Sequence, residues 1–120
     1  MKKKITIITP TFNSASSILA NLNSILKQDY RNWEHIIIDN KSTDNTINLI
    51  RKNYLEKKIR IISEKDSGIF DAINKGIKYS KGEIISILHS DDFYSNKKVL
   101  SSVVKSFEDN EVDIVYGNLI

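Results

Sequence analysis

The sequence predicts an α/β fold in which helices cover both faces of a mostly parallel sheet. Short apolar runs rich in isoleucine alternate with segments whose apolar residues recur at helical spacing. This alternation is typical of parallel strands joined by right-handed crossovers. The runs contain few polar residues, as expected for strands that are covered on both faces. A chain of 120 residues has the size of one domain, so a single sheet is expected.

Five apolar runs are expected to form strands, and a helix is expected in each interval between them. The strands are expected at residues 5–9, 34–39, 59–63, 83–88 and 112–116. Each helix carries an apolar stripe that is expected to face the core. In chain order, the residues of these stripes are Ile18, Leu19, Leu22, Ile25 and Leu26, then Ile47, Ile50, Tyr54 and Leu55, then Ile69, Phe70, Ile73 and Ile77, then Val99, Leu100, Val103, Val104 and Phe107.

Hydroxyl and glycine residues indicate where these helices begin and end. Ser14 or Ser16 is expected to cap the first helix, and Ser42 or Thr43 the second. Gly82 is a candidate C-cap for the third helix, since a glycine often ends a helix.

A further glycine, Gly76, lies inside the third helix. Glycine there costs about 1 kcal/mol relative to alanine, so we expect it to allow close packing of the helix on the sheet. Asp71 and Asn74 share this helix. We expect each of them either to brace the loop near residues 91–92, to cap the helix or to lie on the surface.

The composition excludes several classes of protein. The absence of cysteine excludes disulfide frameworks and thiolate metal sites, and it fits a reducing, cytoplasmic location. The apolar stretch after residues 2–4 is too short for a signal peptide or a membrane span. The net charge of +3 is modest and the lysines are spread along the chain, so we expect no nucleic-acid partner. Attraction of these lysines to an anionic lipid surface stays open.

Two adjacent aspartates, Asp91 and Asp92, follow the strand expected at 83–88. Neighbouring carboxylates repel each other, whereas Mg²⁺ or Mn²⁺ accepts hard oxygen ligands from both. The alternative is a solvated turn without a ligand. In open parallel sheets, ligands bind outside the carboxyl ends of the strands, where residues 9–11 and Asp39 are also expected. Because these polar residues are expected at one edge of the sheet, a metal that holds phosphates is favoured over a solvated turn.

Several common chemistries lack their motifs in this chain. There is no G-x-G-x-x-G after the first strand and no P-loop, which argues against dinucleotide-binding proteins and P-loop NTPases. A phospho-receiver domain would carry its acidic pair after the first strand, where residues 9–11 read Thr-Pro-Thr. No G-x-S-x-G elbow supports acyl transfer. His35 and His89 lie at expected strand positions, so packing or hydrogen-bonded roles are favoured over catalysis.

Four segments, in the same order and with the same spacing, resemble the inverting family-2 glycosyltransferases with a GT-A fold. The segments are Ile7–Asn13, Ile37–Thr46, Asp66–Gly76 and Ile87–Asp92. The second resembles the D-x-x-S-x-D-x-T segment of the family, the third its D-x-G-I-x-D-A-x-N-x-G run and the fourth its D-x-D-type metal motif. The chain departs from the family where Asn40-Lys41 replace a common Asp-Gly or Asn-Gly, and where His89 replaces a first aspartate.

The resemblance implies a three-layer α/β/α, Rossmann-like fold that binds a nucleotide diphosphate sugar. By position, it implies nucleotide-binding roles for Thr9, Pro10, Thr11, Asn13, Asp39, Asp66 and Asp91. It also implies that Asp91 and Asp92 hold Mn²⁺ or Mg²⁺ against the diphosphate. Asp39 is expected to accept a hydrogen bond from the base, and the alternative is that it caps the following loop.

The function implied by the resemblance is an inverting, metal-assisted glycosyltransferase of polysaccharide biosynthesis with a carbohydrate or lipid-linked acceptor. A nucleotide-binding module without turnover and an interaction domain that has lost its ligand stay open as alternatives. Relatives continue with a half that forms the acceptor site and carries the general base. Residues 1–120 are therefore expected to be an incomplete, donor-binding part, truncated after the fifth strand and inactive alone. Peripheral association of a longer protein with the inner face of the membrane also stays open.

Overall fold

A four-stranded parallel sheet forms the centre of the computed structural model, which describes residues 3–54 and 58–110. The strand order is β3-β2-β1-β4, and this all-parallel arrangement confirms the predicted α/β fold. The strand predicted at 112–116 lies outside the described residues. In chain order, the elements are β1 (Ile5–Thr11), α1 (Ile18–Leu26), β2 (Trp33–Asp39), α2 (Thr46–Asn53), β3 (Ile59–Ser63), α3 (Ile69–Tyr79), β4 (Ile84–Ile87) and α4 (Val99–Asn110).

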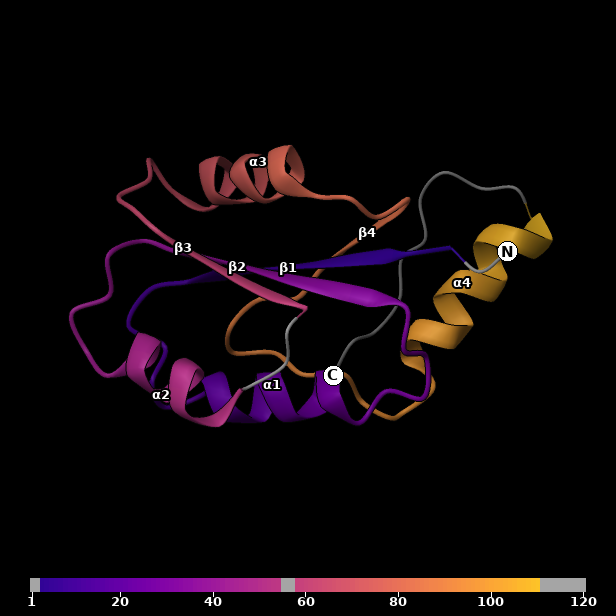
Figure 1. The fold of residues 1–120 in the computed structure, drawn as a ribbon, viewed down its shortest axis with the longest axis horizontal. Helices are drawn as coiled ribbons and strands as arrows, with labels where there is room; N and C mark the ends of the chain where they lie inside the picture. The colour runs from indigo at the N-terminus through magenta and orange to yellow at the C-terminus, as the bar shows by residue number, and fades with distance from the viewer. Residues whose placement is uncertain (1–2, 55–57, 111–120) are drawn as a thin grey trace.

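The sheet lies between two layers of helices (Figure 1). Helix α3 covers one face, and α1 and α2 lie side by side against the other. Helix α4 packs its apolar side into the same cluster as α1. The register places Thr11, Asp39 and Ser63 in one row across β1, β2 and β3. The polar ends of these strands therefore meet at one edge of the sheet.

The two central strands supply a hydrophobic cluster on each face of the sheet, because successive side chains of a strand point to opposite faces. Ile7 and Ile37 belong to the larger cluster, beneath α1, α2 and α4. Ile8 and Ile38 belong to the smaller cluster, together with Ala72 of α3. The central strands are covered on both faces as predicted, whereas Ile85 of the edge strand β4 is 37% exposed.

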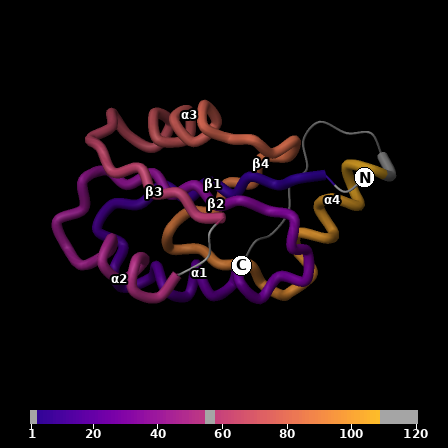
Figure 2. Tube along the Cα trace, viewed as in Figure 1, coloured from indigo at the N-terminus to yellow at the C-terminus, as the bar shows by residue number. Residues whose placement is uncertain are grey.

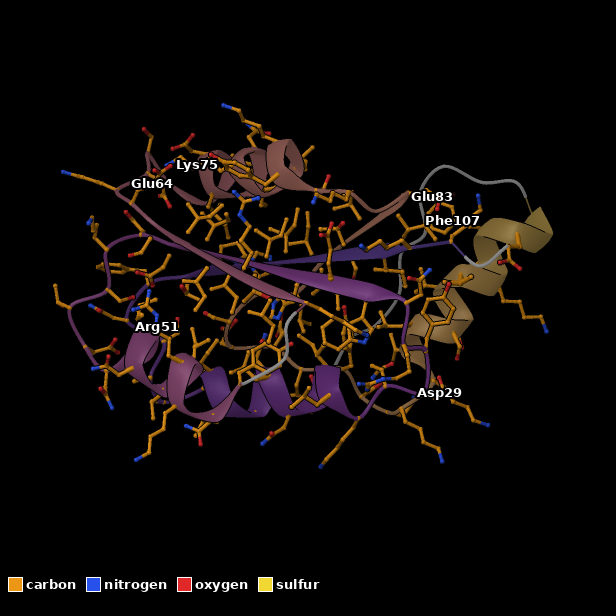
Figure 3. The ribbon with its side chains drawn as sticks, in the orientation of Figure 1. Asp29, Arg51, Glu64, Lys75, Glu83 and Phe107 are labelled. Atoms are coloured by element: carbon orange, nitrogen blue, oxygen red, sulfur yellow. The ribbon has the colours of Figure 1, made fainter. Side chains whose placement is uncertain are left out.

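The predicted apolar faces of α1, α2 and α4 are confirmed at most positions. In α4, Leu100 and Val104 are buried, and Phe107 (Figure 3) packs partly buried against the same cluster. Leu19 of α1 is an exception, since its side chain is 37% exposed. Leu55 lies outside the described residues. In the described ranges, no helix is long and apolar enough to cross a membrane.

Helix α3 is turned away from its predicted orientation. Phe70 is 80% exposed, whereas Ala72 and Gly76 face the sheet. A Cβ at position 76 would lie 2.6 Å from Cγ2 of Ile8, so the glycine allows the helix backbone to approach the sheet, as predicted. On the flank towards β3, Lys75 forms an ion pair of 3.2 Å with Glu64 (Figure 3).

The helices also begin and end at other residues than predicted. Helix α1 follows Ser17 and not Ser14 or Ser16, because the Ser14 carbonyl accepts two backbone hydrogen bonds in a turn that joins β1 to the helix. Helix α3 ends at Tyr79 with Ser80 as its C-cap, so Gly82 is not the C-cap. A Cβ at position 82 would lie 2.6 Å from the backbone nitrogen of Thr6, which explains the glycine by close approach to β1.

Helix α2 begins at Thr46, later than either predicted cap. The N–H of Thr46 donates to Oδ1 of Asp44 at 3.0 Å, so a carboxylate holds the start of the helix. Ser42 and Thr43 instead bond to groups at the edge of the sheet.

Candidate functional site

A cleft of about 790 Å³ opens at the carboxyl edge of the sheet. Its volume lies within the range of roughly 300 to 1,000 Å³ that is usual for ligand sites. Residues from the loops after β1, β2, β3 and β4 line it. The chain proceeds from β1 to β2 and β3 on one side, while β4 lies on the other side of β1. The cleft therefore sits where the strand order reverses, which is where open parallel sheets bind ligands.

Asn13 ties the loop after β1 to the loop after β2. It adopts a left-handed conformation, with φ 49°, which asparagine tolerates better than most residues. Its Oδ1 accepts hydrogen bonds from the N–H of Thr43 at 2.8 Å and of Asp44 at 3.2 Å. Its own N–H donates to Oγ of Ser42 at 2.9 Å. Asn13 thus shapes one wall of the cleft that it lines.

Asp39 is fully buried beneath the cleft and does not line it. Its Oδ1 accepts from the hydroxyls of Thr11 at 2.7 Å and Ser42 at 2.5 Å. Its Oδ2 accepts from the Ser42 N–H and from the Ser63 hydroxyl, both at 2.9 Å. These bonds join the ends of β1, β2 and β3 to the loop after β2, so the geometry favours the loop-capping role. Contact with a base stays a prediction.

The loop after β3 is joined to its neighbours through Asn40. Oδ1 of Asn40 accepts from the N–H of Asp66 at 2.9 Å, and both residues line the cleft. Oδ1 of Asp66 accepts from the N–H of Gly68 at 3.0 Å, and Gly68 has φ 126°, which favours glycine. Oδ2 of Asp71 accepts from the N–H of Ser67 at 2.9 Å. Asp71 therefore holds the loop just before α3, and its hydrogen bonds and ion pairs among the described residues do not reach the loop that carries residues 91–92.

The turn after β4 presents the acidic pair to the cleft. Asp91 is exposed and Asp92 half-buried, and both line the cleft. The N–H of Asp92 donates to the His89 carbonyl at 3.0 Å and closes the turn. The Ser14 hydroxyl donates to the Ser90 hydroxyl at 2.7 Å and links the turn to the loop after β1. Within the described residues, no hydrogen bond or ion pair uses the carboxylate oxygens of either aspartate.

The two free carboxylates fit a divalent cation that is shared with a ligand. Carboxylate oxygens are the hard ligands that Mg²⁺ and Mn²⁺ prefer. In residues 3–54 and 58–110, no group of three or more His, Cys, Asp or Glu side chains could hold a metal by itself. Mg²⁺ is commonly held by one or two carboxylates together with substrate phosphates. Asp91 and Asp92 match this second arrangement.

The charge of the cleft is negative. Asp66, Asp91 and Asp92 line it, and no lysine or arginine of the described residues does. A bound anion would meet no compensating side-chain charge there. A divalent cation would offset the repulsion between these carboxylates and such an anion.

His35 has a structural role, which confirms the prediction from the sequence. Its Nε2 lies 2.7 Å from the Thr9 hydroxyl and its Nδ1 3.1 Å from the Tyr54 hydroxyl. Complete burial lowers the pKa of His35 to about 3, so the ring is neutral in the core. Thr9 is thereby turned away from the cleft. His89 lies beyond the end of β4 and lines the cleft instead of packing in the sheet.

Most of the residues singled out in the sequence meet at the cleft. Those that line it are Pro10, Thr11, Asn13, Asp66, Asp91 and Asp92. Thr9 and Asp39 are buried beneath it. The sequence analysis missed Asn40, Ser90 and Phe12 as lining residues. Phe12 is 57% exposed, and an aromatic residue directly after a strand end is the one signal that could have indicated a stacking surface.

Comparison with protein families matches residues 6–120 to the family described as Glycosyl transferase family 2. Among curated proteins, the chain is 33% identical over 115 residues to an Escherichia coli protein named UDP-Glc:alpha-D-GlcNAc-diphosphoundecaprenol beta-1,3-glucosyltransferase WfgD. The match covers 95% of this chain and 45% of that protein.

Two solved structures have the same fold at 28% sequence identity. TarS 1-349 from S. aureus, in complex with UDP-GlcNAc, matches with a TM-score of 0.83 over 90% of this chain and 32% of that chain. The mannosyltransferase PcManGT from Pyrobaculum calidifontis, in complex with GDP-Man and Mn²⁺, matches with a TM-score of 0.85 over 93% of this chain and 34% of that chain. The chain spans less than half the length of the relatives it matches.

Proposed function

Because the chain belongs to glycosyl transferase family 2, we propose that it binds the nucleotide diphosphate sugar donor of a glycosyltransferase. The whole enzyme would transfer the sugar to a carbohydrate or lipid-linked acceptor in a metal-assisted, inverting reaction of polysaccharide biosynthesis in the cytoplasm. The WfgD name describes such a diphosphoundecaprenol acceptor for that protein. The TarS and PcManGT structures contain nucleotide sugars, which supports the same class of donor here.

One observation carries the proposal. The cleft at the switch in strand order is lined by Asp66, Asp91 and Asp92 and by no basic side chain of the described residues. A site for a bare anion would carry lysine or arginine. A site for a diphosphate that arrives with a divalent cation would carry free carboxylates, and Asp91 and Asp92 supply them.

Different lining residues would contact the base and the diphosphate of a nucleotide sugar donor. Residues 10–13 would flank the base, and the exposed ring of Phe12 offers a stacking surface. Asp39 would contact the base only if it exchanged one of its present hydrogen bonds for one from the base. Asp91 and Asp92 would hold Mn²⁺ or Mg²⁺. The cation, when bound, neutralises the charge that develops on the leaving nucleoside diphosphate.

Calorimetric titration of the purified protein tests this proposal. Uridine, guanosine and thymidine diphosphates would each be added in the presence of Mn²⁺ and again in EDTA. We expect at least one diphosphate to bind with Mn²⁺ and none to bind in EDTA. Failure of all three with Mn²⁺ would refute donor binding, and equal affinity in EDTA would refute the role of the cation.

A further inference from the structure

We propose that Asn21 of α1 is a positioning residue for the cation site, because it holds the turn that presents Asp91 and Asp92. The inference rests on the proposed function. Asn21 does not line the cleft, and the hydrogen bonds of its amide within the described residues go to main-chain oxygens. Its effect on a bound cation would pass entirely through the backbone of the turn.

The amide of Asn21 spans the turn. Its Nδ2 donates to the His89 carbonyl at 2.9 Å and to the Asp92 carbonyl at 3.2 Å. The His89 carbonyl also accepts from the N–H of Asp92 at 3.0 Å. One buried donor therefore fixes both ends of the segment that contains Asp91. Because the bonds go to main-chain oxygens, they set the path of the turn whatever its side chains are.

Asn21 is one of three polar residues, in α1 or just after it, that hold the segment after β4. We call Asn21, Ser24 and Gln28 the α1 clamp. Ser24 Oγ accepts from the N–H of Tyr94 at 3.0 Å. Gln28 Nε2 donates to the Asn96 carbonyl at 2.7 Å, and its Oε1 accepts from the N–H of Leu100 at 3.1 Å. Figure 2 shows this orange segment running from β4 along α1 towards α4.

Two of the three clamp residues are buried, which is unusual for polar side chains. Asn21 is 0% exposed and Gln28 is 2% exposed. Within the described residues, Oδ1 of Asn21 is buried without a hydrogen-bond partner. An unpaired buried acceptor opposes folding, and such groups in a native structure call for an explanation. Positioning of the acidic turn by Nδ2 provides one.

The clamp members differ in what they hold. Only Asn21 bonds to the turn of residues 89–92, whereas Gln28 bonds to Asn96 and Leu100, farther along the segment. Among residues 3–54 and 58–110, no group bonds to the carboxylates of Asp91 and Asp92, so their placement depends on the backbone beneath them. Groups that orient metal ligands typically contribute about 10- to 100-fold to metal affinity.

Titration of Mn²⁺, followed by the electron paramagnetic resonance of the free ion, tests the inference in the purified protein. The variants are Asn21→Leu, Gln28→Met as a buried clamp variant remote from the turn, and Asn23→Leu as an exposed control on the same helix. We expect Asn21→Leu to weaken Mn²⁺ binding about 10- to 100-fold. Gln28→Met and Asn23→Leu should bind like the wild type, even if Gln28→Met lowers stability. Asn21→Ala provides the same comparison if the leucine variant does not fold.

Hydrogen exchange without metal gives a second readout. The amides of residues 91–93 should exchange faster in Asn21→Leu, while those of α3 keep the wild-type rate. Wild-type Mn²⁺ affinity in Asn21→Leu, or equal weakening in Asn21→Leu and Gln28→Met, would overturn the positioning role and leave the cation site standing. Absence of Mn²⁺ binding in the wild type would instead overturn the proposed function, and the inference with it.

Discussion

Replacement of Asp39 by alanine should destabilise the fold, because the carboxylate accepts four hydrogen bonds within the protein. Hydrogen bonds to a charged group contribute about 1.5 to 3 kcal/mol each. Removal of the carboxylate also ends the cost of burying its charge, which is several kcal/mol. The lost hydrogen bonds outweigh the relieved burial cost, so the free energy of unfolding should fall by about 2 to 4 kcal/mol, a large part of the stability of a small domain.

The Asp39→Asn variant provides a graded control. Both partners of Oδ1 are hydroxyls, from Thr11 and Ser42, and a hydroxyl can accept from an amide NH₂. The asparagine oxygen can then keep the bonds from the Ser42 N–H and the Ser63 hydroxyl. Asp39→Asn should therefore lose less than half as much stability as Asp39→Ala.

Urea unfolding, followed by the fluorescence of the single tryptophan, Trp33, measures both variants. Trp33 is 1% exposed in the folded protein, so its emission reports loss of the core. Asp92→Ala serves as a second control, since no described residue bonds to that carboxylate. An Asp39→Ala midpoint equal to that of Asp92→Ala would refute the capping role of Asp39.

Three further predictions concern packing, backbone strain and pH. Gly76→Ala places a Cβ 2.6 Å from Cγ2 of Ile8 and should lower the free energy of unfolding by about 1 to 3 kcal/mol. If the loss in stability of the double variant with Ile8→Ala equalled the sum of the two single losses, that result would contradict this contact. Lys41 has φ 51°, so Lys41→Gly should raise the free energy of unfolding by about 0.5 to 1 kcal/mol, and a lower urea midpoint would refute the strain. His35 has a folded pKa of about 3, below its ordinary value of 6.5, so only the unfolded chain gains this proton between those pH values. The free energy of unfolding should therefore fall by about 1.4 kcal/mol per pH unit as the pH drops from 6.5 towards 3, while above pH 6.5 His35 adds no pH dependence. Urea unfolding of His35→Gln at several pH values should lack this pH-dependent loss of stability.

The sheet and the location of the cleft could be predicted from the sequence because both follow from local patterns. Isoleucine-rich runs identified the strands, and the rule for parallel sheets brought their carboxyl ends to one edge. Pro10, Asp66 and Asp92 reach that edge although they lie far apart in the sequence.

Features that depend on fit between distant segments could not be predicted in this way. Phe70 belongs to an apolar stripe, yet α3 turns Ala72 and Gly76 to the sheet because small residues allow close approach. Asn21 in α1 and Gln28 just after it are polar residues of a kind that usually lies on the surface. They are buried because the segment after β4 returns across α1, a contact that no local pattern contains.

In the proposed function, a cation at Asp92 allows a diphosphate to bind in the acidic cleft. The most direct measurement is the affinity of the preferred nucleoside diphosphate in Mn²⁺ for the wild type, Asp92→Asn and Asp29→Asn. Asp29 (Figure 3) follows the far end of α1 and does not line the cleft, so it is a matched control. We predict that Asp92→Asn weakens binding by about tenfold or more, as expected for a lost metal ligand, and that Asp29→Asn has no effect. Equal affinity in all three proteins would contradict the central claim.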